Sequence, residues 1–453
     1  MTGDTRPGRS DVALLLIGLA AGTLMFSSMD TMWPLVDAEL TAPPERLELQ
    51  AREFLERTGH DVADHRSASV LTVDDRALDW LERAYGHDRT QEWVRAGVPL
   101  VEYQVGFKRP GEPRSWVVFV DPRHGVSGWS HGLEEDDAGP SLEVDEARGR
   151  TREALVAGLD LDLGGWTETA VSSIDRPARR DHTFTWEREL ADRPETVERL
   201  TARCAGDEII YARRAVIVPG PARRAARAAE APGRALESVG FALLAVFAIA
   251  AFLVFLTRLR DGQVRLWRSS AVAGIVFACL VGTWLLQTGI LFLRWEPLWP
   301  QWISTLQYLV NRVGTEIWMT LVLLALIGAG DALDRSRGAD RGASLWSLLS
   351  GKITDPAVGL ASFRGVMIGL VCGGVMTFAV LALGLGGATV SLQPRGFFFY
   401  ALNSASPVLS TLLFFLNVAL LEELGYRFFA GTWLLERTGR RWVAIVLPAI
   451  VYG

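Results

Sequence analysis

The chain has 453 residues, of which 49% are hydrophobic and 22% are charged, so neither a disordered chain nor an ordinary soluble enzyme fits it. Its 46 basic residues are outnumbered by 52 acidic ones, which argues against a nucleic-acid partner, because neutralising phosphates needs a basic excess. Long apolar runs fill residues 236–453, whereas residues 38–235 have the charged, mixed pattern of a globular domain. This uneven distribution excludes a single soluble domain.

The first apolar run, residues 11–29, follows Arg6 and Arg9 and is long enough to cross a membrane. A secretory signal peptide is one interpretation of this pattern. No small-x-small cleavage site follows the run, however, because the next residues are Ser27-Ser28-Met29-Asp30. We therefore expect residues 1–37 to be a retained signal anchor.

Residues 38–235 are predicted to form an α+β domain made of two similar units. Each unit combines a helix that has one apolar face with strands rich in β-branched and aromatic residues. The expected helices are residues 45–58 and 144–157, and the expected strands are 101–107, 116–120, 183–188 and 208–218. Their order suggests an internal duplication, and it loosely resembles the PepSY-type domains found outside bacterial membranes. Such a domain is expected to bind a protein or peptide, or to cover the membrane part.

His124 and His131, in the stretch His-Gly-Val-Ser-Gly-Trp-Ser-His, could be interpreted as a metal-binding pair. Neither a carboxylate nor a cysteine lies at a recognised ligand spacing from them. Two histidines in surface loops are therefore the expected interpretation.

Five further runs are long enough to span a bilayer, which needs roughly 20 mostly apolar residues. They are residues 238–257, 270–293, 303–329, 363–386 and 400–421, and a seventh run begins at Trp442. The fold class is therefore an α-helical polytopic membrane protein with an inserted extracytoplasmic α+β domain. Three spans fall in residues 236–356, and the rest fall in residues 357–453.

The short loops decide the expected orientation, because Lys and Arg accumulate in cytoplasmic loops. Arginines and one lysine gather in every second loop: Arg258, Arg260, Arg265, Arg268, Arg335, Arg337, Arg341, Lys352, Arg437, Arg440 and Arg441. The alternate short loops hold only Arg294 and Arg395. The arginine-rich stretch 213–234 is an exception, but it ends a long segment, where the rule is weak. We expect a cytoplasmic N-terminus. We also expect the protein to lie in a bacterial plasma membrane.

A cluster of charged residues interrupts the apolar sequence near residue 422. The chain reads Leu-Glu-Glu-Leu-Gly-Tyr-Arg from residue 421 to 427. Each charge costs about 2.5–3.5 kcal/mol near the bilayer centre, so a stretch that retains them is a candidate for function. Glu423 and Arg427 are four residues apart, which suits an ion pair, while Glu422 points about 100° away. Glu422 would then be free to face a polar cavity and to take a proton from water.

The alternative is that Glu422, Glu423 and Arg427 mark the cytoplasmic end of a span and reach out to the membrane surface. The apolar residues that follow, 428–435, favour the intramembrane interpretation.

The motif Glu422-Glu423-x-x-x-Arg427, followed by a further apolar helix, resembles the first motif of the CPBP family of intramembrane proteases. This family includes type II CAAX prenyl proteases and bacteriocin-processing proteins. The resemblance implies that Glu422, together with a histidine of a second motif, Phe-x-x-x-His, activates a water that attacks a peptide bond. A third motif, with His and Asn or Asp, would stabilise the oxyanion. Members are often described as metalloproteases, so zinc is an implied cofactor, although a metal-free glutamate mechanism is also argued for them.

The histidines depart from the family pattern. Val451-Tyr452-Gly453 could begin the second motif, with Tyr452 at the Phe position, but the sequence ends before a histidine. All six histidines precede residue 183, so the membrane spans that follow hold none. We expect the chain to be a fragment of a longer protein, an inactive relative being the alternative.

A second intramembrane cluster comprises Asn311, Arg312 and Glu316. Arg312 and Glu316 are four apart and are expected to pair with each other. A functional role and a structural pair near a helix end are equally compatible with the sequence. Arg364, at the start of the 363–386 run, is expected to reach the inner membrane surface.

The sequence thus predicts an intramembrane endopeptidase that acts on a peptide bond at or in the membrane, with Glu422, Glu423 and Arg427 as its site residues. The substrate would be a protein or peptide, and a prenylated one is among the candidates. The apolar spans would lie in the lipid bilayer. The alternative is a non-enzymatic membrane sensor that binds a partner through its extracytoplasmic domain. A transporter is disfavoured, because no paired Gly/Pro-broken helices occur in matching halves.

Overall fold

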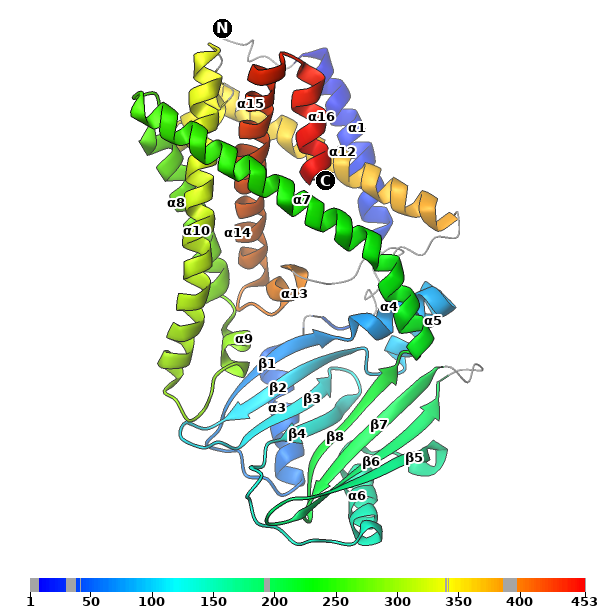
Figure 1. The fold of residues 1–453 in the computed structure, drawn as a ribbon. Coiled ribbons are helices and arrows are strands. Elements are labelled where there is room, and N and C mark those ends of the chain that lie inside the picture. The colour runs from blue at the N-terminus through cyan, green and yellow to red at the C-terminus, as the bar shows by residue number, and fades with distance from the viewer. Residues whose placement is uncertain are drawn as a thin grey trace.

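A computed structural model describes residues 8–29, 38–40, 42–190, 196–338, 340, 342–385 and 397–452. Figure 1 shows two parts: a bundle of long helices and, below it, a twisted sheet with helices against it. The chain is therefore a largely helical protein that carries one antiparallel sheet domain between its first and second long helices.

In the part of the chain that the structure describes, six helices are long and apolar enough to cross a membrane. These are α1 (Arg9–Ser27), α7 (Gly220–Arg260), α8 (Leu266–Leu285), α10 (Gln301–Ser336), the described part of α12 (Pro356–Leu385) and the composite helix Pro407–Thr438. Short helices connect or follow them: α9 (Thr288–Leu293), α11 (Ala343–Leu349), α13 (Phe397–Leu402) and α16 (Arg441–Tyr452). The six-span interpretation agrees with these helices in number and order.

Several predicted boundaries are wrong. The expected span 238–257 belongs to a longer helix, because α7 begins at Gly220, within the stretch expected to belong to the sheet domain. The expected span 270–293 is two helices, because α8 ends at Leu285 and α9 begins only at Thr288. The expected span 400–421 begins later and continues to Thr438. Its end is set by Gly439, whose φ of 65° gives the left-handed conformation that stops a helix. No glycine or proline break of this kind stands near residue 421, so the helix runs on.

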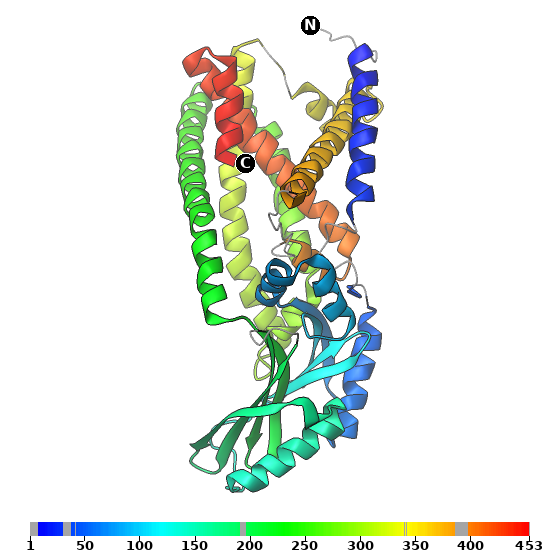
Figure 2. The same cartoon turned by 90° about the vertical axis from the view of Figure 1, so that its right-hand side faces the viewer.

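α1 and α12 form a closely packed pair of spans. A Cβ on Gly374 would lie 2.5 Å from the Cβ of Ala21, and one on Gly18 would lie 3.0 Å from the sulfur of Met367. Small residues therefore let the two backbones approach, as is usual between helices in membranes. Figure 2 shows that this pair diverges from the other spans toward the end of the molecule farthest from the sheet.

The sequence predicted that Arg364 reaches the inner membrane surface on its own. In the structure it binds Asp11 of α1 instead. Its Nε and Nη2 atoms donate to the two carboxylate oxygens of Asp11 at 2.7 and 3.0 Å. The bidentate contact holds the starts of α1 and α12 together, because planar guanidinium and carboxylate groups match in geometry.

Among the residues described, the sheet domain has eight antiparallel strands in the order β1-β2-β3-β4-β8-β7-β6-β5. The strands are β1 (Arg66–Val73), β2 (Val101–Lys108), β3 (Ser115–Asp121), β4 (Gly125–His131), β5 (Thr167–Asp175), β6 (Arg180–Glu189), β7 (Val197–Ala205) and β8 (Glu208–Ile217). Each group of four is a meander of neighbouring strands, and β4 joins β8 in the middle through the register Trp129↔Ala212. One continuous sheet therefore unites the two units.

Each unit begins with a helix and continues with four strands, apart from the helical pair α4 (Asp75–Tyr85) and α5 (His87–Arg95) inserted after β1. The leading helices are α3 (Pro44–Arg57) and α6 (Val144–Leu159), close to the expected 45–58 and 144–157. The four expected strands correspond to β2, β3, β6 and β8. Strands β1, β4, β5 and β7 were not predicted, because polar residues interrupt their apolar patterns.

The domain core lies between one face of the sheet and the two leading helices. Phe54 of α3 packs against Trp129 of β4 with ring centroids 5.3 Å apart, and Gly158 of α6 lies against the same two rings. Both helices therefore cover the same face of the sheet. Phe184 and Trp186 of β6 are fully buried in this core.

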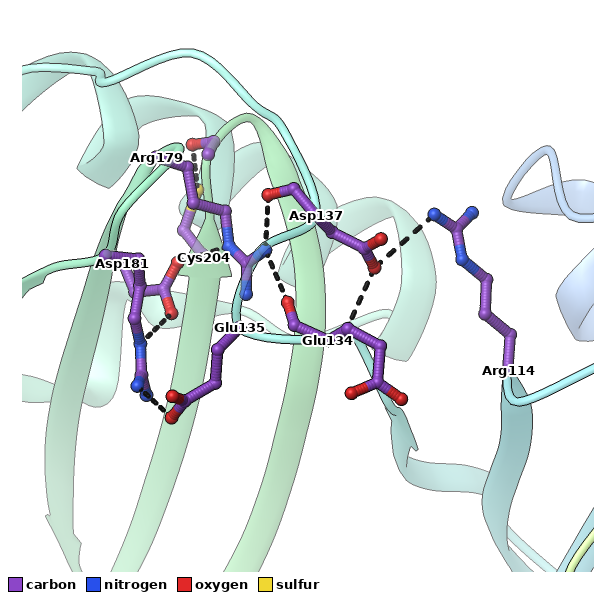
Figure 3. A network of polar contacts seen from close by, with 9 residues as sticks. Arg114, Glu134, Glu135, Asp137, Arg179, Asp181 and Cys204 are labelled. Atoms are coloured by element: carbon purple, nitrogen blue, oxygen red, sulfur yellow. Dashed lines mark hydrogen bonds and ion pairs between the residues drawn. The ribbon is translucent and has the colours of Figure 1, made fainter.

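The segment between β4 and α6, which connects the two units, is held by a buried arginine (Figure 3). Arg179 donates to the backbone oxygens of Glu134 and Asp137 at 2.8 and 2.7 Å, and to Asp181 at 2.8 Å. Cys204, in the same region, is buried and donates to the oxygen of Gly206. Burial raises the pKa of this thiol to about 11, so it stays protonated and unreactive.

The sheet domain is docked directly on the membrane part. The ammonium of Lys108, at the end of β2, donates to the backbone oxygens of Leu293 and Trp295 at 2.8 and 2.5 Å. Burial lowers the pKa of Lys108, yet these carbonyls satisfy the charged group. The contact fixes the segment between α9 and α10 against the sheet edge.

The arginine-rich short loops all lie on the side of the bundle away from the sheet, as does the start of α1 (Figure 1). They include the turn at Gly262 and the turn at Gly439. The two sides thus differ in basic residues in the way the sequence predicted.

Candidate active site

The carboxylate motif, defined here as Glu422, Glu423 and Arg427, lies in the last of the six long helices. That helix joins α14 (Pro407–Ala419), the π-helical segment η2 (Leu420–Arg427) and α15 (Phe428–Thr438) into 32 residues without a break. At 1.5 Å per residue its length is about 48 Å, which exceeds the roughly 30 Å hydrocarbon core. The motif lies near the middle of this helix.

The backbone of the motif is a π-helix, in which each N–H bonds to the carbonyl five residues earlier. Such segments are rare, appear mostly inside α-helices and are frequently found at functional sites. Gly425 stands in its middle, and a Cβ there would lie 2.9 Å from Cδ1 of Leu323 on α10. A glycine therefore lets α10 approach the wide turn closely.

Neighbouring helices cover two sides of η2. Leu421 and Leu424 pack against the cluster formed by α8 and α10, which contains Val276 and Leu323. Tyr426 packs instead against the cluster that includes Phe247 of α7. The segment η2 is thus held in the bundle by its apolar residues, while its charged residues occupy the remaining face.

The predicted ion pair is present. Nη1 of Arg427 lies 2.5 Å from Oε1 of Glu423, and the two side chains are 43% and 58% exposed in the protein. Glu422 is half-buried, and it has no hydrogen bond or ion pair with any described residue. One carboxylate is therefore neutralised by the arginine, and its neighbour is left available.

Two polar residues on the same helix were missed by the sequence reasoning. Ser410 and Asn417 are 0% and 8% exposed, and neither Oγ of Ser410 nor Oδ1 of Asn417 has a hydrogen-bond partner among the described residues. Their seven-residue spacing puts both on one face of α14. This spacing is the sequence signal from which they could have been predicted. Unsatisfied polar atoms in an apolar layer are costly, so they mark this face as a candidate contact for a polar ligand or water.

The expected pair of Arg312 and Glu316 does not form, although the structure describes both residues. Trp284 of α8 takes both contacts instead. Its Nε1 donates to Oε1 of Glu316 at 3.1 Å, and the guanidinium of Arg312 lies 4.3 Å from its ring centroid. The cluster is therefore a structural link between α8 and α10, made through the Trp284 ring. The spacing of Arg312 and Glu316 in the sequence could not predict that a tryptophan of another helix lies between them.

A buried ion pair, which the sequence reasoning missed, links the start of α8 to the last turns of α10. Nη1 of Arg268 lies 3.1 Å from Oδ1 of Asp331, with side chains only 11% and 6% exposed. Arg335 contacts the other oxygen of Asp331 at 3.0 Å, and the Arg268 guanidinium lies 4.8 Å from the Trp346 ring centroid. These contacts pair both charges, although Nε of Arg268 has no hydrogen-bond partner among the described residues.

The two histidines considered for metal binding make different contacts. Nε2 of His131 lies 2.9 Å from Oε1 of Glu208, and its ring packs on Trp116, which also packs on His60. His124 lies 3.2 Å from Asp121. Burial lowers the pKa of His60, and the contact with His131 lowers the pKa of Glu208.

In the part of the chain that the structure describes, no three His, Cys, Asp or Glu side chains gather in an arrangement that could hold a metal ion. The carboxylate motif offers zinc only Glu422 and a glutamate already paired with arginine, so the described residues do not form a zinc site. Val451 and Tyr452 end α16, and Gly453 lies outside the described residues.

A cleft of about 1200 Å³ opens in the sheet domain, between α4 and the polar start of α7. Its floor includes Glu102, which is 2% exposed and receives a hydrogen bond from Nη2 of Arg213 at 3.1 Å. Burial raises the pKa of Glu102 despite the arginine. Nothing in the sequence pointed to this cleft, because its walls are about 150 residues apart along the chain.

No family model matches the chain, and no match is found among curated proteins or solved structures. The CPBP and PepSY-type resemblances therefore remain predictions.

Proposed function

We propose that the protein is an intramembrane endopeptidase in which Glu422 activates a water molecule. The observation that carries this proposal is the asymmetry of the motif. Glu423 is paired with Arg427, whereas Glu422 is half-buried and has no partner among the described residues. An unpaired carboxylate midway along a 32-residue apolar helix is costly to keep, which favours a role in chemistry.

In the proposed reaction, the Glu422 carboxylate takes a proton from water while the water oxygen attacks the carbonyl carbon of a peptide bond. The same carboxyl group then gives the proton to the leaving nitrogen as the C–N bond breaks. Water is added across the bond, and Glu422 returns to its starting state. Arg427 holds Glu423, so that the neighbouring charge is neutralised during the reaction.

Substrate and sidedness belong to the same proposal. A protein or peptide segment at the membrane, a prenylated one among the candidates, would reach the unpaired carboxylate from the bilayer.

The sheet domain would lie outside the cytoplasm of a bacterial cell, because the arginine-rich turns lie on the opposite side. A membrane-impermeant maleimide tests this arrangement: in intact cells it should label D136C in the sheet domain and should spare R337C.

The catalytic assignment can be tested without a known substrate. The full-length protein, reconstituted with a bacterial membrane extract and with a farnesylated peptide, is incubated in H₂¹⁸O. Hydrolysis places one heavy oxygen in each new C-terminal carboxylate, which mass spectrometry detects. We expect such termini with the wild type and none with E422Q. Unchanged termini with E422Q would exclude Glu422 as the base.

The second candidate is a non-enzymatic membrane sensor that binds a partner through its sheet domain. The cleft of about 1200 Å³ between α4 and α7 favours a binding role for this domain. The ¹⁸O experiment distinguishes the two candidates, because a sensor yields no ¹⁸O-labelled termini with the wild type or with E422Q.

A further inference from the structure

The cleft between α4 and the start of α7 has two charged walls. Its lining includes six arginines and five carboxylates, together with apolar surface from Trp80, Val73, Leu100 and Val218. The arginines are Arg76, Arg83, Arg213, Arg223, Arg227 and Arg234, and the carboxylates are Asp74, Asp75, Asp79, Glu102 and Glu230.

Most of the carboxylates are already engaged. Asp79 pairs with Arg83, Glu230 with Arg234 and Glu102 with Arg213, at 2.9, 2.9 and 3.1 Å. Asp74 accepts a hydrogen bond from the backbone of α4 at 3.1 Å, and Asp75 has a partner of its own. Three of the five carboxylates are therefore neutralised by arginines, and the lining holds one more arginine than it holds carboxylates.

Three arginines remain without an ion pair among the described residues: Arg76 on α4, and Arg223 and Arg227 on α7. Arg223 and Arg227 are four residues apart and so lie on one face of α7, the face that lines the cleft. Opposite them, Arg76 stands in the first turn of α4. In addition, Nε of Arg213 is buried without a hydrogen-bond partner. The cleft thus presents free donors and a small excess of positive charge.

The position of these arginines argues against a lipid headgroup as the occupant. The apolar part of α7 begins at Leu236, which is 73% exposed. Arg227 precedes Leu236 by about 14 Å along the helix axis, at 1.5 Å per residue. The headgroup layer of one leaflet is only about 5–8 Å thick. In Figure 1 this end of α7 lies beside α4 and α5, on the sheet side of the bundle.

We propose that this cleft binds an acidic peptide segment, whose carboxylates pair with Arg76, Arg223 and Arg227. A volume of about 1200 Å³ holds several residues of an extended chain, which is more than a small anion needs. The apolar lining around Trp80 would receive the peptide's apolar side chains. The inference concerns binding alone and does not depend on the chemistry proposed for Glu422.

The test uses the full chain in nanodiscs of zwitterionic lipid and measures fluorescence anisotropy. The probes are a labelled octapeptide of alternating Glu and Leu and its Gln-Leu analogue. We expect the acidic peptide to bind, and the Gln-Leu analogue to bind at least about tenfold more weakly. Added salt should weaken binding of the acidic peptide. Failure of the acidic peptide to bind, or equal binding of the two peptides, would overturn the proposal.

Variants assign the binding to the cleft. R223Q/R227Q should weaken binding of the acidic peptide by about tenfold, because two exposed ion pairs are lost. R224Q is the matched control, since Arg224 is exposed on the same turn but does not line the cleft, and it should bind as the wild type does. Unchanged binding by R223Q/R227Q would contradict the proposal, as would complete displacement of the peptide by vesicles of anionic phospholipid. E422Q should bind normally, so a failure of catalysis and a failure of the cleft are distinguishable.

Discussion

Asn403, which follows α13, hydrogen-bonds both backbone groups of Leu71 on the edge strand β1. Its Nδ2 donates to the Leu71 oxygen at 3.0 Å, and its Oδ1 accepts from the Leu71 N–H at 2.5 Å. The amide side chain thus acts as a strand neighbour and covers part of an exposed sheet edge. Through this contact a residue next to the sixth span positions the sheet domain on the membrane part.

N403A should loosen this docking. The substitution leaves a buried N–H and a buried C=O of Leu71 unpaired, at about 1–3 kcal/mol for each group. Hydrogen exchange measured by mass spectrometry should show faster exchange of the Leu71 amide. S404A is the control, because the Ser404 hydroxyl has no partner among the described residues, and it should leave that exchange unchanged. Equal exchange in N403A and wild type would refute the docking role.

R427A should reduce the amount of folded protein, because it leaves the Glu423 charge unpaired in an apolar helix. The cost is about 2.5–3.5 kcal/mol if the charge stays near the bilayer centre. The charge-swapped variant E423R/R427E should restore most of the yield, since it rebuilds the pair with the same two groups. Yields of monodisperse protein after size-exclusion chromatography compare the three proteins. An R427A protein that accumulates like the wild type would show that the pair does not support the fold.

Acidification should destabilise the sheet domain near His60 and Glu208. Burial holds the pKa of His60 below 6.5, so the unfolded chain binds its proton first, and stability falls as pH drops below that value. The contact with His131 holds the pKa of Glu208 below 4.5, so its contribution is present above pH 4.5 and is lost on further acidification. Both groups act in the same direction.

Tryptophan fluorescence during heating can follow this loss, because Trp116 packs on His60 with ring centroids 4.0 Å apart. The melting temperature should decrease below about pH 6.5, and H60Q should flatten the decrease between pH 6.5 and 5 or so. H124Q, at a partly exposed histidine, should keep the wild-type profile. Identical profiles for H60Q and wild type would exclude His60 as the group responsible.

G374A should disturb the contact between α1 and α12. The new Cβ would lie 2.5 Å from the Ala21 Cβ and 2.8 Å from its backbone oxygen, so the helices must separate. We expect a loss of about 1–3 kcal/mol, measured as a lower midpoint of thermal aggregation in nanodiscs. A Cβ on Gly369 of the same helix would meet no atom within 4 Å, so G369A should be neutral or slightly stabilising. If both variants behave alike, close packing at Gly374 is not required.

The sequence by itself determined the features that depend on near neighbours in the chain. Apolar runs of sufficient length gave the six spans, and the spacing of Glu423 and Arg427 gave their ion pair, because residues four apart share a helix face. The two helix-and-strand units were also visible in part, through the strands with continuous apolar patterns.

Only the tertiary structure decided the contacts between distant segments. The pairing of β4 with β8 makes one sheet of two units, and Trp284 separates Arg312 from Glu316 by binding each of them. The cleft likewise exists because the start of α7 folds back against α4. Such contacts depend on which surfaces meet after folding, and local spacing carries no information about that.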